Sequence, residues 1–121
     1  MSQVCVSVPT DDGKTVKLGH FGDAKYYYHY VPGPNGEWVL KEIVENPFAG
    51  EHEHDGGESS KRPRIYELNK GCTHIVSVAF GPGGQQFMER HGLVVVRVRP
   101  RTTIREALAL VSERVALQQP G

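Results

Sequence analysis

The chain is 121 residues long, has no net charge at neutral pH, and is 38% hydrophobic with 14 glycines and 8 prolines. This length suits one domain with a buried core, and the balanced charge does not favour binding to nucleic acid or to an acidic membrane surface. The glycine and proline content is typical of a compact α/β domain with long loops. We expect a single domain over residues 1–117 and a frayed tail over residues 118–121.

The two cysteines and the start of the chain favour a protein of the reducing cytoplasm. Cys5 lies in an apolar strand, where a free thiol acts as a small hydrophobic group, and Cys72 lies at a more exposed helix-to-strand junction. Two cysteines do not make a disulfide framework. The N-terminus lacks the basic and apolar segments of a signal peptide, and no apolar run approaches the length of a membrane span.

The first half of the chain predicts a strand followed by a hairpin. Residues 4–8 are short, apolar and β-branched, which is typical of a buried central strand. Residues 25–31 are rich in tyrosine, and a second strand follows over residues 38–44. The turn-forming segment 32–36 between them predicts a β-hairpin.

A polar segment over residues 49–60 has no side chain that a core could use, so we expect a long flexible loop. His52 and His54 alternate with acidic residues in this loop, and imidazole and carboxylate groups together suit divalent transition metals. Their spacing is not that of a closed zinc site, which favours a solvated linker.

The second half alternates helices and strands. A helix is expected from near Ser60 to Gly71 with Pro63 in its first turn, and a strand follows over residues 73–78. A short helix over residues 85–90 comes next and ends before a glycine.

A strand over residues 93–98 and a helix opened by the capping box Thr103-x-x-Glu106 complete the chain. The order βββαβαβα predicts an α/β protein with a mixed sheet covered by helices. Right-handed crossovers make the strands at residues 4–8, 73–78 and 93–98 its parallel part. This strand order could be that of a ribonuclease-H-like sheet.

Two glycine-rich loops follow strands of the parallel part: Gly19-His20-Phe21-Gly22 and Gly81-Pro82-Gly83-Gly84. Neighbouring parallel strands bring such loops to one crevice, where open α/β sheets bind ligands. The helix that starts after the second loop attracts anions, although a tight turn without a ligand is the alternative. His20 can ligate a metal or pair with an anion, or it can cap its turn and point to water.

Catalytic machinery is poorly supported by the sequence. It contains no Gly-x-Ser-x-Gly elbow, no convincing Cys/His pair, and no carboxylates in the central strands to hold the two metals of a nuclease. Cys72 is a candidate soft ligand for iron or an iron–sulfur species, although no partner cysteine stands near it. We therefore expect that the protein is not an enzyme.

Several motifs stand in a specific order along the chain: His20-Phe21-Gly22, Glu45-Asn46-Pro47, the His-rich loop, the segment 71–84, Gly92-Leu-Val-Val and Thr103-Ile-x-Glu-Ala-Leu. This pattern resembles the dinitrogenase iron–molybdenum cofactor biosynthesis family, which includes NifX, NafY, the C-terminal part of NifB and small stand-alone proteins. The resemblance covers nearly the whole chain. It implies a three-layer α/β/α, ribonuclease-H-like fold with a five-stranded mixed sheet and no nuclease activity.

The resemblance also implies binding of the iron–molybdenum cofactor or its iron–sulfur precursor, and transport of that cluster between partner proteins. The candidate cofactor-binding residues are His20, Phe21, Gly22, Gly81, Gly83 and Gly84. The candidate metal ligands are His20, Cys72, His52 and His54.

Two functions of different classes follow from these observations. The first is a non-enzymatic carrier of an iron–sulfur or iron–molybdenum-type cluster, with a cluster-assembly or acceptor protein as its partner. The second is a small regulatory or interaction module that binds an organic anion or a protein partner at the same crevice. A hydrolase is a third and weaker hypothesis.

Overall fold

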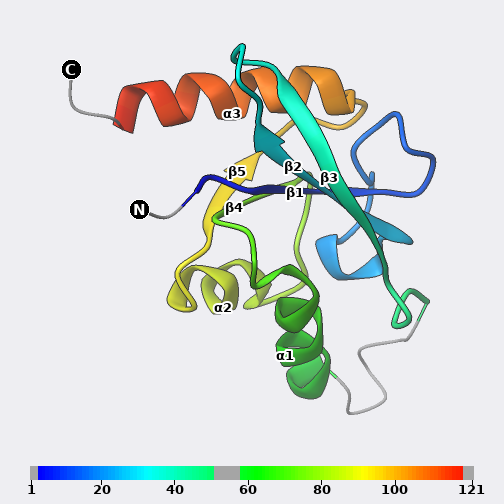
Figure 1. The fold of residues 1–121 in the computed structure, drawn as a ribbon. Helices are drawn as coiled ribbons and strands as arrows, with labels where there is room; N and C mark the ends of the chain where they lie inside the picture. The colour runs from blue at the N-terminus through cyan, green and yellow to red at the C-terminus, as the bar shows by residue number, and fades with distance from the viewer. Residues whose placement is uncertain (1–2, 51–57, 119–121) are drawn as a thin grey trace.

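The computed structural model describes residues 3–50 and 58–118, which form a five-stranded mixed sheet with helices on both faces (Figure 1). The strands are β1 (Val6–Thr10), β2 (Tyr26–Pro32), β3 (Trp38–Glu45), β4 (His74–Ser77) and β5 (Val94–Arg97). The helices are the short 3-10 helix η1 (Phe21–Asp23), α1 (Glu58–Asn69), α2 (Gly84–Arg90) and α3 (Ile104–Gln118). None of these helices is long and apolar enough to cross a membrane.

The strand order is β3-β2-β1-β4-β5, and β1, β4 and β5 are parallel as predicted. Ser7 of β1 pairs with Ile75 of β4, which in turn pairs with Val95 of β5. The predicted hairpin is present, since β2 pairs antiparallel with β3 and also with β1. These pairings confirm the mixed α/β sheet and its ribonuclease-H-like order.

Each face of the sheet has its own apolar layer, because successive residues of a strand point to opposite faces. α3 covers one face, whose buried residues include Val6, Val8, Val76, Val96, Ile104, Ala107 and Val111. α1 and α2 cover the other face, whose buried residues include Phe21, Tyr27, Ile65, Ile75, Met88 and Val95. Figure 1 shows α3 on one side of the sheet and the two shorter helices on the opposite side, which confirms the three layers.

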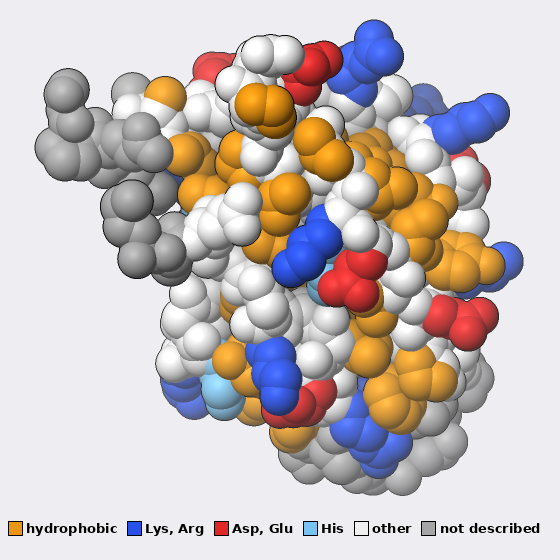
Figure 2. Space-filling view, in the orientation of Figure 1, with side chains coloured by type: hydrophobic (Ala, Val, Ile, Leu, Met, Phe, Trp, Pro, Cys, Tyr) orange, Lys and Arg blue, Asp and Glu red, His pale blue; other side chains and the backbone are white. Residues whose placement is uncertain are grey.

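The edge strand β3 presents apolar side chains at the surface, and Figure 2 shows hydrophobic side chains gathered along it. Val39, Leu40 and Ile43 are between 42% and 50% exposed. Lys41 and Glu42 lie between them in the strand, and charged residues in an edge strand oppose pairing with another sheet.

β1 extends two residues beyond the predicted end at Val8. Pro9 remains in the strand opposite Tyr27, although proline has no N–H to donate. The pairing between β1 and β4 covers only Val6 and Ser7, so Pro9 lies beyond that ladder. Its carbonyl accepts a hydrogen bond from the backbone N–H of Lys17 at 2.7 Å.

α1 begins at Glu58, so residues 58–60 are helical and do not belong to the predicted loop over residues 49–60. Pro63 is therefore inside the helix, beyond the first turn where we predicted it, and it cannot donate the usual intrahelical bond. At the other end of the chain, α3 continues to Gln118, the first residue of the predicted tail. Helix ends commonly differ by one or two residues from a sequence-based boundary because the last turns fray.

The predictions that Cys5 is a free thiol and that no partner cysteine stands near Cys72 are wrong, because Cys5 and Cys72 form a disulfide across 67 positions of the sequence. Cys72 is also not the more exposed residue that we expected, since both side chains are at most 5% exposed. β1 and β4 are adjacent parallel strands, so the residues that precede them lie side by side. The backbone N–H of Thr73 donates to the carbonyl of Cys5 at 2.8 Å.

Candidate functional site

The two glycine-rich loops meet at one pocket beyond the carboxyl end of β4. Residues 20–22 of the first loop line one part of it. The second loop contributes Gly81, Pro82 and Gly84, preceded by Phe80. The two helices on this face of the sheet supply the remaining lining residues, which are Lys61, Arg62 and Ile65 of α1 and Met88 of α2. The cavity volume is about 30 Å³, which is room for roughly two water molecules. A ligand larger than this volume would therefore extend beyond the mouth of the pocket.

The first loop is anchored to the sheet through Phe21. The backbone N–H of Phe21 donates to the carbonyl of Ala79 at 2.9 Å, and its own carbonyl accepts the Tyr27 hydroxyl at 2.7 Å. The Phe21 ring is 1% exposed and packs against the Tyr27 ring, with 5.0 Å between the centroids. His20 precedes this anchor and is exposed at the rim of the pocket.

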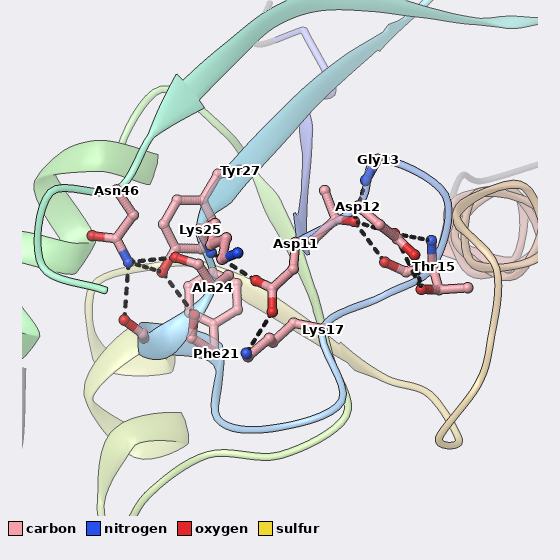
Figure 3. A network of polar contacts seen from close by, with 12 residues as sticks. Asp11, Asp12, Gly13, Thr15, Lys17, Phe21, Ala24, Lys25, Tyr27 and Asn46 are labelled. Atoms are coloured by element: carbon pink, nitrogen blue, oxygen red, sulfur yellow. Dashed lines mark hydrogen bonds and ion pairs between the residues drawn. The ribbon is translucent and has the colours of Figure 1, made fainter. Parts of the chain in front are cut away.

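Asn46, which follows β3, holds the other end of the same loop (Figure 3). Its side-chain amide donates to the carbonyls of Gly22 at 3.0 Å and of Ala24 at 2.8 Å. Its carbonyl oxygen accepts the backbone N–H of Phe48 at 3.0 Å. The backbone beside His20 is therefore fixed from two sides by buried polar contacts.

Asp11 ties the loop to the end of β1, as Figure 3 shows. One carboxylate oxygen is 2.7 Å from Lys17 Nζ, and the other accepts the backbone N–H of Lys25 at 2.9 Å. Partial burial works to raise the pKa of Asp11, but these two partners outweigh it and hold the pKa below its usual value. Burial, together with the charges of Asp23 and Asp11, raises the pKa of Tyr27 well above its usual range, so its hydroxyl remains a donor.

The glycines of the second loop make close contacts within the protein. Gly83 has a φ of +76°, and a Cβ there would lie 2.9 Å from Arg62 Nη2. A Cβ at Gly84 would lie 3.2 Å from the Phe80 ring. Gly83 therefore lies against the Arg62 guanidinium and is not part of the pocket lining, whereas Gly81 and Gly84 line the pocket.

Two cationic side chains of α1 reach the pocket, and sequence reasoning did not identify them. Lys61 is 5% exposed, and its ammonium group lies 2.7 Å from Asp23 Oδ1. The Arg62 guanidinium donates to the carbonyl of Pro82 in the glycine loop. Cations near a helix N-terminus are opposed by the helix dipole. The unfavourable position of two cations near the start of α1 is therefore the feature of the sequence that could have indicated contacts with other parts of the protein.

The structure brings most of the predicted site residues together. His20, Phe21, Gly22, Gly81 and Gly84 line the pocket, whereas Gly83 contacts Arg62 without lining it. Cys72 is not at this pocket, because it pairs with Cys5 before the start of β4. His52 and His54 lie outside the described residues.

Comparisons with known proteins agree with this fold. The sequence pattern of the dinitrogenase iron–molybdenum cofactor family matches residues 2–114. The NMR structure of a NifB-like protein of the DUF35 family from Thermotoga is 23% identical, with a TM-score of 0.59, and the match covers 91% of this chain and 88% of that one. The high-resolution structure of the apo form of the orange protein from Desulfovibrio gigas is 16% identical, with a TM-score of 0.61, and the match covers 99% of this chain and 94% of that one. A search of curated proteins finds no match. Since the family pattern spans nearly the whole sequence, the chain belongs to the dinitrogenase iron–molybdenum cofactor family.

Proposed function

We propose that this protein is a non-enzymatic carrier that binds an iron–sulfur or iron–molybdenum-type cluster, or a precursor of one, at the mouth of the pocket. The observation that carries the proposal is the convergence of His20, Lys61 and Arg62 around two glycine-containing loops. Membership of the iron–molybdenum cofactor family supports the same class of ligand.

The chemistry of the pocket suits an anionic cluster with an open coordination position. The exposed imidazole of His20 can ligate a metal at the rim. A guanidinium group has five N–H donors, so Arg62 can keep its contact with Pro82 and still donate to a cluster. Gly22 and Gly81 carry no side chains to obstruct the approach. The cavity of about 30 Å³ is too small to enclose a cluster, so the bound cluster would stay accessible to a second protein.

The described pocket lining supports a role in binding more than a role in catalysis. His20 could act as a general base, but the lining contains no carboxylate, hydroxyl or thiol side chain that could act as a nucleophile beside it. A carrier must also receive and release its cluster, so the proposal includes a cluster-assembly or acceptor protein as partner. The proposal further includes a cytoplasmic location, whose reducing conditions favour the dithiol form of Cys5 and Cys72 over the disulfide.

Anaerobic reconstitution with ferrous iron and sulfide tests the proposal. The wild-type protein should acquire visible absorption and bound iron, and His20→Ala should lose most of both. Arg62→Gln should bind more weakly, because one cationic donor is removed. His91→Ala is the matched control: this exposed histidine follows α2 and does not line the pocket, so the variant should bind like the wild type.

Equal iron binding by the wild type and His20→Ala, or an unchanged spectrum of the wild type, would overturn the carrier proposal. The alternative is a module that binds an organic anion at the same cationic pocket. Thermal-shift measurements with phosphates and nucleotides separate the two, because a ligand selective for the folded state raises its melting temperature. A rise in melting temperature with phosphates or nucleotides that is lost in Arg62→Gln but kept in His20→Ala would favour the organic anion.

A further inference from the structure

A second group of metal-ligating side chains lies at the opposite end of the central strands. The Sγ atoms of Cys5 and Cys72 and a ring nitrogen of His29 all lie within 4.8 Å of one another, and all three residues are buried. Cys5 precedes β1 and Cys72 precedes β4, whereas the pocket lies beyond the carboxyl end of β4. This group is therefore separate from the proposed cluster site.

The backbone holds the two cysteines together independently of the bond between their sulfurs. The N–H groups of Thr73 and His74 donate to the carbonyl of Cys5 at 2.8 and 3.0 Å. The N–H of Cys72 donates to the carbonyl of Asn69 at 2.9 Å, at the end of α1. These contacts would keep the two side chains adjacent after reduction.

His29 faces polar side chains on both sides of its ring. It lies opposite Ser7 in the β1–β2 register, and its Nε2 is 3.2 Å from Asn69 Oδ1. Its Nδ1 is 3.7 Å from Glu42 Oε1 on β3. A carboxylate behind a histidine orients imidazole ligands in metal sites; with Glu42 on the Nδ1 side of the ring, Nε2 is the nitrogen that would bind a metal.

We propose that the reduced protein binds one Zn²⁺ through Cys5, Cys72 and His29. Two thiolates and a neutral imidazole would neutralise the charge of Zn²⁺, and an interior site requires that balance. Zinc in proteins is usually four-coordinate, which leaves one position for an oxygen ligand such as the amide of Asn69 beside His29.

The zinc form and the disulfide form exclude each other. A dithiol reductant supplies two electrons and two protons, breaks the sulfur–sulfur bond of Cys5–Cys72, and is itself oxidised to a disulfide. Zinc binding then displaces the two thiol protons. The disulfide protein lacks thiolate ligands and should not bind zinc at this position.

The experiment uses the full-length protein, reduced and freed of reductant under anaerobic conditions, and titrated with Co²⁺ as a spectroscopic substitute for Zn²⁺. We expect one Co²⁺ per chain with a thiolate-to-cobalt charge-transfer band, and loss of the band when Zn²⁺ is added. Cys72→Ser should abolish the band. Glu42→Gln should weaken binding about tenfold, as expected for a partner of a ligating histidine, and His29→Gln should weaken it further.

Two controls separate this site from other histidines. A variant with His52→Ala and His54→Ala should keep the band, because imidazole ligands alone do not produce it. His20→Ala should also keep it, so failure of the cluster proposal and failure of the zinc proposal are distinguishable. If a cysteine variant does not fold, the wild type still provides a test, since Zn²⁺ should protect Cys5 and Cys72 of the reduced protein from alkylation. Absence of the band, or a band and alkylation rate unaffected by Zn²⁺, would overturn the zinc site.

Discussion

Replacing Asn46 by alanine tests whether buried polar contacts fix the loop that carries His20. The side chain is 5% exposed and makes three hydrogen bonds to the backbone: it donates to Gly22 and Ala24 and accepts from Phe48. Each lost bond costs about 1 kcal/mol, and more where a buried partner is left unsatisfied. Asn46→Ala should therefore lower the free energy of unfolding by about 3 kcal/mol.

Equilibrium unfolding in urea measures this loss, with the Cys5–Cys72 disulfide kept intact in every sample. With an m-value of about 2 kcal/mol/M, the midpoint should fall by about 1.5 M. Asn35→Ala is the control, because Asn35 is exposed in the β2–β3 turn, and its effect should stay within about 0.5 kcal/mol. Asn46→Asp keeps an acceptor for Phe48 but removes both amide donors, so it should be at least as destabilising as alanine. An Asn46→Ala midpoint equal to that of Asn35→Ala, at the same m-value, would refute the reasoning.

Three further substitutions test the packing, the glycine loop and the electrostatics. Val111→Ala should lower stability by about 2 kcal/mol because Val111 is fully buried on the side of α3 that packs against the sheet, whereas Leu110→Ala, at a residue of the same helix that is 43% exposed, should cost less than about 1 kcal/mol in the same urea assay. Gly83→Ala should lower the melting temperature, since the positive φ disfavours alanine and the new Cβ would meet the Arg62 guanidinium. Asp11→Asn should be less stable than the wild type at pH 7; because the folded-state pKa of Asp11 is lowered from 3.8, the difference should persist above that value and disappear as the pH falls through the folded-state pKa. A difference that is independent of pH down to full protonation would contradict the Asp11 contacts.

Features that depend on residues a few positions apart could be predicted from the sequence. The capping box is one example: the N–H of Thr103 donates to Glu106 Oε1 at 2.9 Å, and the N–H of Glu106 donates to Thr103 Oγ1 at 3.1 Å. The hairpin is another, because its strands are joined by a short turn of proline, asparagine and glycine. The meeting of the two glycine-rich loops was also predictable, because right-handed crossovers constrain which strands lie side by side.

Other features depend on contacts that local patterns do not encode. Lys61 and Arg62 were not predicted at the pocket, because their position follows from how α1 packs across the sheet. Cys5 and Cys72 are 67 positions apart, and their contact depends on the register between β1 and β4. His29 joins them because β2 pairs with β1 in one particular register.

The sequence by itself therefore determined the order of the helices and strands, the family, and the two loops that meet at the crevice. Local hydrogen bonding, side-chain periodicity and the handedness of crossovers are sufficient for those features. Only the tertiary structure decided that the charged side chains of Lys61 and Arg62 lie at the crevice. It also decided that Cys5, Cys72 and His29 meet at the other end of the central strands. Both depend on strand register and helix packing, and a shift of one residue in register would turn His29 to the opposite face.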